Sequence, residues 1–109
     1  MAESNFATLT VTVTTAGTPV QISSTDIWVK SFEVWIRDTN TSVNMYVGSS
    51  SVANSGTWMP RLRSAIYSFS VDSDRGLPAA DGLFNLKNIY MDATSSGDVA
   101  LVQYTTHTV

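Results

Sequence analysis

The sequence Ile-Trp-Val-Lys-Ser-Phe-Glu-Val-Trp-Ile-Arg, residues 27–37, is the densest run of β-branched and aromatic residues in the chain. Turn-forming residues follow at 38–42, and Val-Asn-Met-Tyr-Val-Gly follows them at 43–48. Phe32, Val34 and Ile36 alternate with residues of the opposite face, so an extended strand would bury one face only. Two such runs around a turn predict a β-hairpin, which we expect to be the centre of an all-β domain.

The first run also contains an irregularity. Ile27 and Val29 follow one alternation, whereas the apolar positions from Phe32 onward follow the other. A strict two-residue period cannot bury both sets on one face. A bulge near Lys30 and Ser31 would reconcile them, and the alternative is that both faces are covered at that end.

Alternation elsewhere predicts further strands. The clearest lies at 7–15, where apolar residues alternate with threonines, whose branched Cβ suits an extended backbone. Shorter patterns predict strands at 20–22, 65–71, 87–93 and 99–106, separated by turn-forming residues. About seven strands without a helical period predict a single-domain β-sandwich, jelly-roll-like in arrangement, with a small β-barrel as the alternative.

Length and composition limit the possible domain organisation and location of the chain. A chain of 109 residues is expected to form one domain, with residues 1–6 as an N-terminal arm and 7–109 as the β domain. No apolar run reaches the roughly 20 residues of a membrane span. The first residues lack the basic and apolar segments of a secretory signal, so we expect a product made in a cytoplasm and not exported by that route.

The charge pattern excludes several kinds of partner. The net charge is −3, and the six Lys and Arg residues are scattered singly, which argues against binding to nucleic acid or to an anionic membrane. Charged residues make up only 14% of the chain, so its polar surface suits burial against neighbouring subunits. Zero cysteines exclude disulfides and thiolate metal sites.

The sequence offers no catalytic constellation. His107 is the only histidine and lies near the C-terminus without a second nitrogen ligand. No Gly-x-Ser-x-Gly turn is present, and a terminal histidine is a poor partner for a nucleophilic serine. We therefore expect a protein that is not an enzyme and that carries no metal and no cofactor.

Three segments carry a family resemblance: Val11–Ile22, with its Thr-Ala-Gly-Thr-Pro-Val-Gln turn, Asn44–Val52, with Tyr-Val-Gly-Ser, and Leu86–Ala93, with Ile-Tyr-Met-Asp. Their order and spacing are similar to those of small structural proteins of tailed-bacteriophage virions. The resemblance implies a β-sandwich cement or decoration protein that binds the major capsid protein on the outside of a head shell. The aromatic 27–37 strand and Trp-Met-Pro-Arg at 58–61 depart from the family pattern.

A cement role also implies self-association and placement on the capsid surface of a virion assembled in the host cytoplasm. We expect a homo-oligomer, with a trimer preferred because the threefold positions of an icosahedral shell invite one. The expected interface residues are the apolar and forked cationic anchors Phe6, Trp35, Trp58, Met59, Arg61 and Arg63.

Each anchor has a structural alternative. Residues 49–63 form the longest stretch without a regular period, and loops of that length are often functional. In that alternative, the Trp58 side chain is buried in the core, and the protein's own second sheet covers Trp35. Phe6 would latch onto a neighbouring subunit, or the terminus would fray.

The alternative function is a virion-associated carbohydrate- or receptor-binding module. β-Sandwiches that bind glycans expose tryptophan and tyrosine on one face. Trp28, Trp35, Trp58 and Tyr46 are the residues that could form such a platform.

Overall fold

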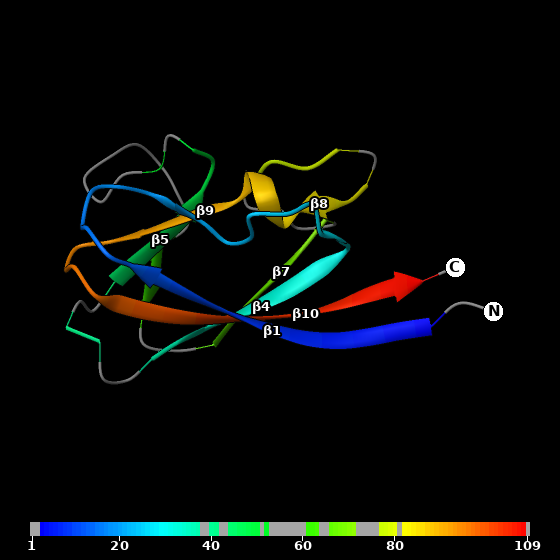
Figure 1. Ribbon diagram of the computed structural model, residues 1–109, viewed down its shortest axis with the longest axis horizontal. Helices are drawn as coiled ribbons and strands as arrows, with labels where there is room; N and C mark the ends of the chain where they lie inside the picture. Colours follow the sequence, from blue (N-terminus) through cyan, green and yellow to red (C-terminus); the bar gives the residue numbers. More distant parts are fainter. Residues whose placement is uncertain are drawn as a thin grey trace.

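The β-branched and aromatic runs form strands in two antiparallel sheets that pack face to face (Figure 1). The computed structural model describes residues 3–37, 40–41, 44–50, 52, 61–63, 66–71, 77–80 and 82–108, with backbone alone for 3–6, 61–63 and 106–108. Sheet A contains, in spatial order, β1 (Glu3–Val13), β10 (Asp98–Thr108), β4 (Ser31–Ile36) and β7 (Ile66–Ser70). Sheet B contains β2 (Val20–Gln21), β9 (Tyr90–Ala93), β5 (Asn44–Gly48) and β6 (Arg61–Arg63).

A short third sheet pairs β3 (Trp28–Val29) with β8 (Phe84–Asn85), and one 3-10 turn, η1 (Leu86–Asn88), follows β8. Neither four-stranded sheet closes on itself, so the fold is a sandwich and not the β-barrel that the sequence left as an alternative. The strands predicted at 7–15, 20–22, 65–71, 87–93 and 99–106 are confirmed as β1, β2, β7, β9 and β10, with shifted ends.

The strand pairing is nested from the ends of the chain inward. β1 pairs with β10, β2 with β9, β3 with β8, β4 with β7 and β5 with β6, all antiparallel. The chain is thus one long antiparallel ribbon whose tip is the β5–β6 pair. Pairing of β10 with β4 and of β5 with β9 rolls the ribbon into two sheets. This is a jelly-roll arrangement, as expected from the sequence.

The predicted hairpin at 27–48 is wrong. β4 lies in sheet A and β5 lies in sheet B, so the turn between them crosses from one sheet to the other. Asn40 holds this crossing, because its side chain occupies the place of a strand partner for β10. Its Nδ2 donates to the Val99 carbonyl at 2.8 Å, and its Oδ1 accepts from the Val99 N–H at 2.9 Å. The Thr41 N–H then donates to Asp98 Oδ1 at 2.9 Å, which holds the crossing against β10.

The irregularity predicted at Lys30 is real but takes a different form. The chain leaves the small sheet after Val29 and enters sheet A at Ser31, so it changes sheets rather than forming a bulge within one strand. Val29 and Phe32 are both buried, although they lie on opposite alternations of the sequence, because they belong to different strands. The alternative in which both faces are covered at that end is also wrong, because Trp28 is 46% exposed and Ser31 is exposed, so each strand buries one face only.

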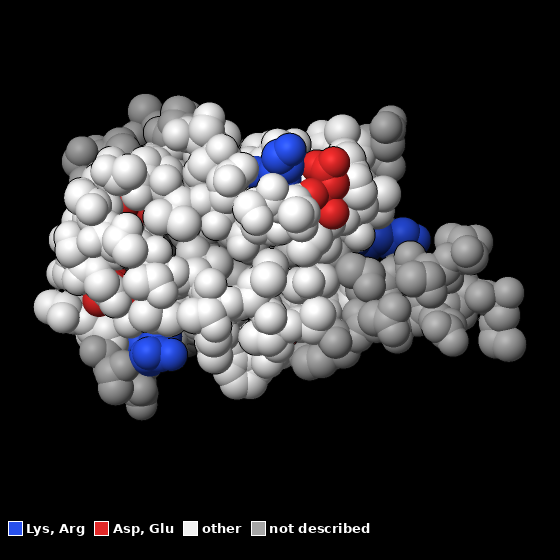
Figure 2. Space-filling view, viewed as in Figure 1, with Lys and Arg blue, Asp and Glu red and all other residues white. Residues whose placement is uncertain are grey.

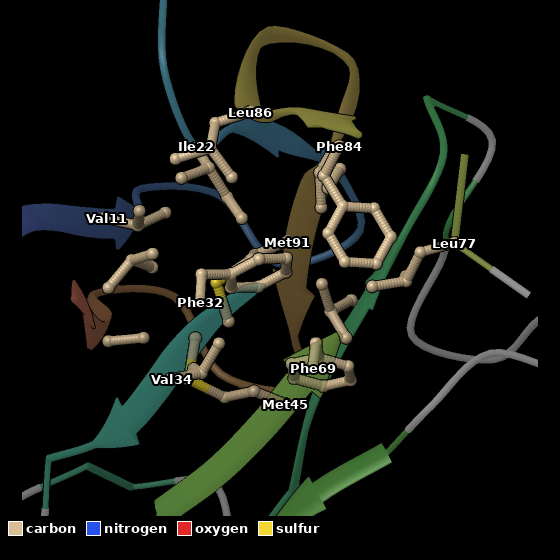
Figure 3. Close-up of a cluster of buried hydrophobic side chains, with 14 of the residues drawn as sticks. Val11, Ile22, Phe32, Val34, Met45, Phe69, Leu77, Phe84, Leu86 and Met91 are labelled. Atoms are coloured by element: carbon tan, nitrogen blue, oxygen red, sulfur yellow. The ribbon is translucent and has the colours of Figure 1, made fainter. Parts of the chain in front are cut away.

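The core fills the space between sheets A and B (Figure 3). Phe32 is at its centre, stacked on Phe69 at a centroid distance of 5.1 Å and edge-on to Phe84 at 5.4 Å. Met45 and Met91 reach the same cluster from sheet B and are fully buried. Aromatic pairs of this geometry stabilise a core beyond the area that they bury.

The β1–β10 ribbon is longer than the rest of sheet A. β10 pairs with β4 only from Ala100 to Tyr104, whereas its pairing with β1 continues to Thr108 opposite Glu3. The ribbon extends from the body, and both ends of the chain lie at its tip (Figure 1). Residues 3–6, expected as a separate arm, therefore continue strand β1.

Candidate docking surface

The face of sheet A that points away from sheet B is the candidate docking surface. Along β4, Phe32, Val34 and Ile36 are buried, whereas Glu33 and Trp35 point to the opposite side. Trp35 is 37% exposed. The interpretation in which the second sheet covers Trp35 is therefore wrong, because sheet B packs on the other face.

Strand register places apolar side chains in one row across this face. Trp35 lies opposite Ile66 of β7 on one side and opposite Leu101 of β10 on the other. Leu101 in turn lies opposite Thr10 of β1. We call the residues Ile66, Trp35, Leu101 and Thr10 the apolar row. Ile66 is 53% exposed, so two of its members present large apolar side chains to solvent.

A polar row runs beside it. Ser68, Glu33, Gln103 and Thr8 are direct neighbours across the same four strands. The Ser68 hydroxyl donates to Glu33 Oε2 at 3.4 Å. A hollow of about 220 Å³ lies along this row, lined by Ser31, Phe32, Glu33, Ser68, Gln103, Tyr104 and Thr105. The hollow is shallow and carries mainly hydroxyl, amide and carboxylate groups.

Charge is sparse on the described surface. In the view of Figure 2, Lys, Arg, Asp and Glu side chains form small separate groups on an otherwise uncharged surface. On the four strands of sheet A, the apolar row contains no charged residue, and Glu33 is the only charged member of the polar row. Such a surface binds by shape and apolar contact rather than by long-range attraction.

The other expected interface residues are distributed differently. Phe6 belongs to β1, opposite Thr105, and Arg61 and Arg63 belong to β6, opposite Tyr46 and Asn44. Arg63 precedes Ile66 by three residues, so β6 and β7 bring the two to one edge of the sandwich. Trp58 and Met59 lie outside the described residues.

The four residues of the expected aromatic platform do not come together on one face. Tyr46 is buried, with 8% of its surface exposed. Trp28 is exposed but belongs to β3, beside a small hollow of about 90 Å³ lined by Trp28, Pro78, Ala79, Ala80, Asn85 and Asn88. Only Trp35 contributes an exposed aromatic side chain to the described face of sheet A.

Sequence reasoning missed Ile66 and Leu101. Both are apolar residues on the polar alternation of their strands, since the neighbours at i±2 on those faces include Ser68 and Gln103. A large apolar residue at a position that the pattern assigns to solvent is the signal that would have identified them. The row itself needs the register of β4 with β7 and β10, which no local pattern specifies.

A buried carboxylate lies under the turn that precedes β2. Asp92 is fully buried, and its Oδ1 accepts from the N–H groups of Gly17 at 3.0 Å and Ala93 at 2.8 Å. Its Oδ2 and the Oδ1 of Asn44 have no hydrogen-bond partner among the described residues. Gly17 has a φ of 89°, a conformation that a residue with a side chain adopts only with strain. Asp92 thus holds the Thr-Ala-Gly-Thr-Pro turn in place.

The part of the chain that the structure describes holds no group of three or more His, Cys, Asp or Glu side chains arranged to bind a metal ion. His107 lies in β10 opposite Ser4. No helix among the described residues has the length and apolar character needed to cross a membrane. No protein-family model and no curated protein matches the chain.

Proposed function

We propose that this protein is a non-enzymatic structural protein of a tailed-bacteriophage virion, a cement protein that binds the outside of the head shell and stabilises it. The docking surface is the outward face of sheet A, and the partner is the major capsid protein. The proposal rests on the resemblance of three segments to such virion proteins and on the surface that the fold presents.

The observation that carries the proposal is the strand register that makes Trp35 and Ile66 direct cross-strand neighbours. Both are large apolar side chains, 37% and 53% exposed, and they lie side by side on a rigid sheet. Interfaces draw most of their affinity from a few such aromatic and aliphatic anchors surrounded by polar groups. Here the neighbouring polar row supplies that rim, with Ser68 and Glu33 next to Ile66 and Trp35.

Two further features support a shell-binding role. Jelly rolls are common among viral capsid proteins, although a fold alone does not specify a function. Arg61 and Arg63 belong to the strand at the same edge of the sandwich as Ile66, and guanidinium groups bind shell carboxylates with two parallel hydrogen bonds. Phe6 is proposed as a further contact, at the end of the β1–β10 ribbon.

Co-sedimentation with head shells of the phage that encodes the protein tests this function. The wild-type protein should bind with saturable stoichiometry. Trp35→Ala and Ile66→Ser should each weaken binding at least about 30-fold, as expected of an interface anchor. Trp28→Ala is the matched control, because Trp28 is 46% exposed but lies in β3, which is not one of the four strands of sheet A. The proposal fails if the wild-type protein does not bind the shells or if Trp28→Ala weakens binding as much as Trp35→Ala.

The second candidate function is a virion-associated carbohydrate- or receptor-binding module. The hollow of about 220 Å³ favours it, because hydroxyl, amide and carboxylate groups line the hollow on the same face of sheet A that exposes Trp35. A sugar bound there should protect tryptophan fluorescence from quenching, and Trp35→Ala should abolish that protection. Protection by glycans without any binding to shells would favour this module over the cement protein.

A further inference from the structure

We infer that β1 pairs with β1 of a second copy, antiparallel and about a two-fold axis, and joins the two A sheets into one sheet of eight strands. This inference names a contact between copies and does not depend on the head shell. Its test uses the purified protein alone, so its failure and that of the cement proposal are distinguishable.

Strand β1 is an unprotected edge of sheet A. It runs for eleven residues, Glu3–Val13, and its register with β10 continues from end to end without a bulge. Among described strands, β1 pairs with β10 alone. An edge strand presents a row of unpaired N–H and C=O groups, and proteins normally blunt such edges with Lys, Pro, bulges or short length. β1 has none of these, and its one charged residue is Glu3 at the far end.

The other edges of the two four-stranded sheets are short. β7 has five residues, β6 has three and β2 has two. β6 also carries two arginines, Arg61 and Arg63. Short strands and charged residues are the usual means of preventing edge-to-edge pairing. The contrast with β1 indicates that this edge is kept open for a strand partner.

The exposed edge of β1 is also complementary to a second copy of itself. Thr8, Thr10 and Thr12 are exposed, whereas Val11 and Val13 are buried in the core. Antiparallel pairing about a two-fold axis keeps outward residues opposite outward residues only if the axis passes through a residue position. A register centred on Thr10 uses all seven residues from Ala7 to Val13, places Thr10 opposite Thr10 and places Thr8 opposite Thr12. Threonine pairs stabilise adjacent strands, and no like charges meet.

The consequence is a continuous surface across the two copies. Thr10 is the last member of the apolar row, next to Leu101. The register centred on Thr10 therefore aligns the two apolar rows end to end through the axis, with Trp35 and Ile66 repeated on both sides. A pairing of this kind gives a dimer rather than the trimer expected from threefold positions of a shell.

Cysteine cross-linking tests the register, and the absence of any native cysteine makes it unambiguous. Thr10→Cys places two thiols directly opposite each other, at a Cα separation of about 4.5–5.5 Å that a disulfide spans. Thr12→Cys is the matched control. Its thiol lies opposite Thr8, and its own counterpart is four residues, about 13 Å, away along the partner strand. Under mild oxidation Thr10→Cys should form a covalent dimer at least ten times faster than Thr12→Cys. Equal rates, or no cross-linking of either variant, would overturn the inference.

Charge pairs test the same contact without covalent chemistry. In the proposed register, Thr8→Lys with Thr12→Lys places lysines opposite each other and should raise the dimer dissociation constant at least ten-fold. Thr8→Lys with Thr12→Glu places opposite charges together and should restore it to within about three-fold of wild type. Sedimentation equilibrium measures both. A wild-type mass of monomer or trimer at millimolar concentration, or the same dissociation constant for both double variants, contradicts the pairing.

Discussion

Asp92 of β9 accepts a hydrogen bond from the backbone N–H of Gly17 at 3.0 Å, although 75 residues separate the two in sequence. Gly17 belongs to the Thr-Ala-Gly-Thr-Pro turn, and Asp92 belongs to the Ile-Tyr-Met-Asp segment. Both segments contribute to the resemblance to virion proteins. Their contact gives these residues a structural role, since the carboxylate fixes the turn that carries the chain from sheet A to sheet B.

Substitution of Asp92 by alanine should destabilise the fold by about 1–3 kcal/mol, because the buried Ala93 N–H and the Gly17 N–H then both lose their acceptor. Urea unfolding measures the change. Ser96→Ala is the control, since Ser96 Oγ accepts from the adjacent Ala16 N–H at an exposed position. There water replaces the lost acceptor, so the cost should stay within about 0.5 kcal/mol. Equal losses in the two variants would show that burial of Asp92 does not matter.

Asn40→Ala should also cost about 1–3 kcal/mol, because the Val99 N–H loses its acceptor and the Val99 carbonyl keeps only the longer bond from the Arg37 N–H at 3.3 Å. Asn40→Asp should restore little of this loss. An aspartate can still accept from the Val99 N–H, but it places a second oxygen against the Val99 carbonyl where the amide donated. Thermal unfolding of the two variants, with Thr41→Ala as control, measures the effect. Full stability of Asn40→Asp would contradict the two-bond arrangement.

The two faces of β4 should respond differently to truncation. Phe32→Ala removes a side chain that contacts Phe69 and Phe84 in the core and should cost about 3–5 kcal/mol. Trp35→Ala, on the outward face, should cost less than about 1 kcal/mol. Denaturant unfolding compares them directly. A larger loss for Trp35→Ala would mean that this side chain is a core residue and would remove it from the docking surface.

Hydrogen exchange should divide β10 into two parts. Residues Ala100–Tyr104 lie between β1 and β4, so their amides should exchange slowly, with protection close to that of global unfolding. Among the described strands, residues 106–108 pair with β1 alone, and they should exchange at least a hundred times faster. Mass spectrometry of peptides from the C-terminal strand resolves the two. Uniform protection along β10 would contradict this division, because it would mean that another segment covers residues 106–108.

Much of the fold follows from local patterns. The alternation of Leu9, Val11 and Val13 predicts β1, and the burial of Ile89, Met91 and Ala93 on one face is confirmed in and next to β9. The pairing of strands did not follow, because the 27–48 stretch has the local signature of a hairpin. The side chain of Asn40 decides against it through bonds to Val99, a residue distant in sequence.

The candidate site was predicted only in part. The sequence predicts Trp35 as an interface residue, because it is a large aromatic on the strand face opposite Phe32 and Val34. Ile66 and Leu101 were not, since their importance arises from register with Trp35 and not from their own neighbours. Register between strands distant in sequence depends on the whole fold. Trp58 and Met59 lie outside the described residues, so their role remains a prediction.

The nested pairing of strands also orders the steps by which the chain can fold. The β5–β6 pair closes a loop of residues 49–60, whereas the β1–β10 pair closes residues 14–97. Each doubling of loop length adds about 0.6 kcal/mol to the entropic cost of closure. Once β5 and β6 have met, each outer pair adds only the connections beside the pair already formed, of which the longest, residues 71–83, is about as long as the first loop. The ribbon tip is therefore the least costly nucleus, and β1, the strand inferred to bind a second copy, is the last to be put in place.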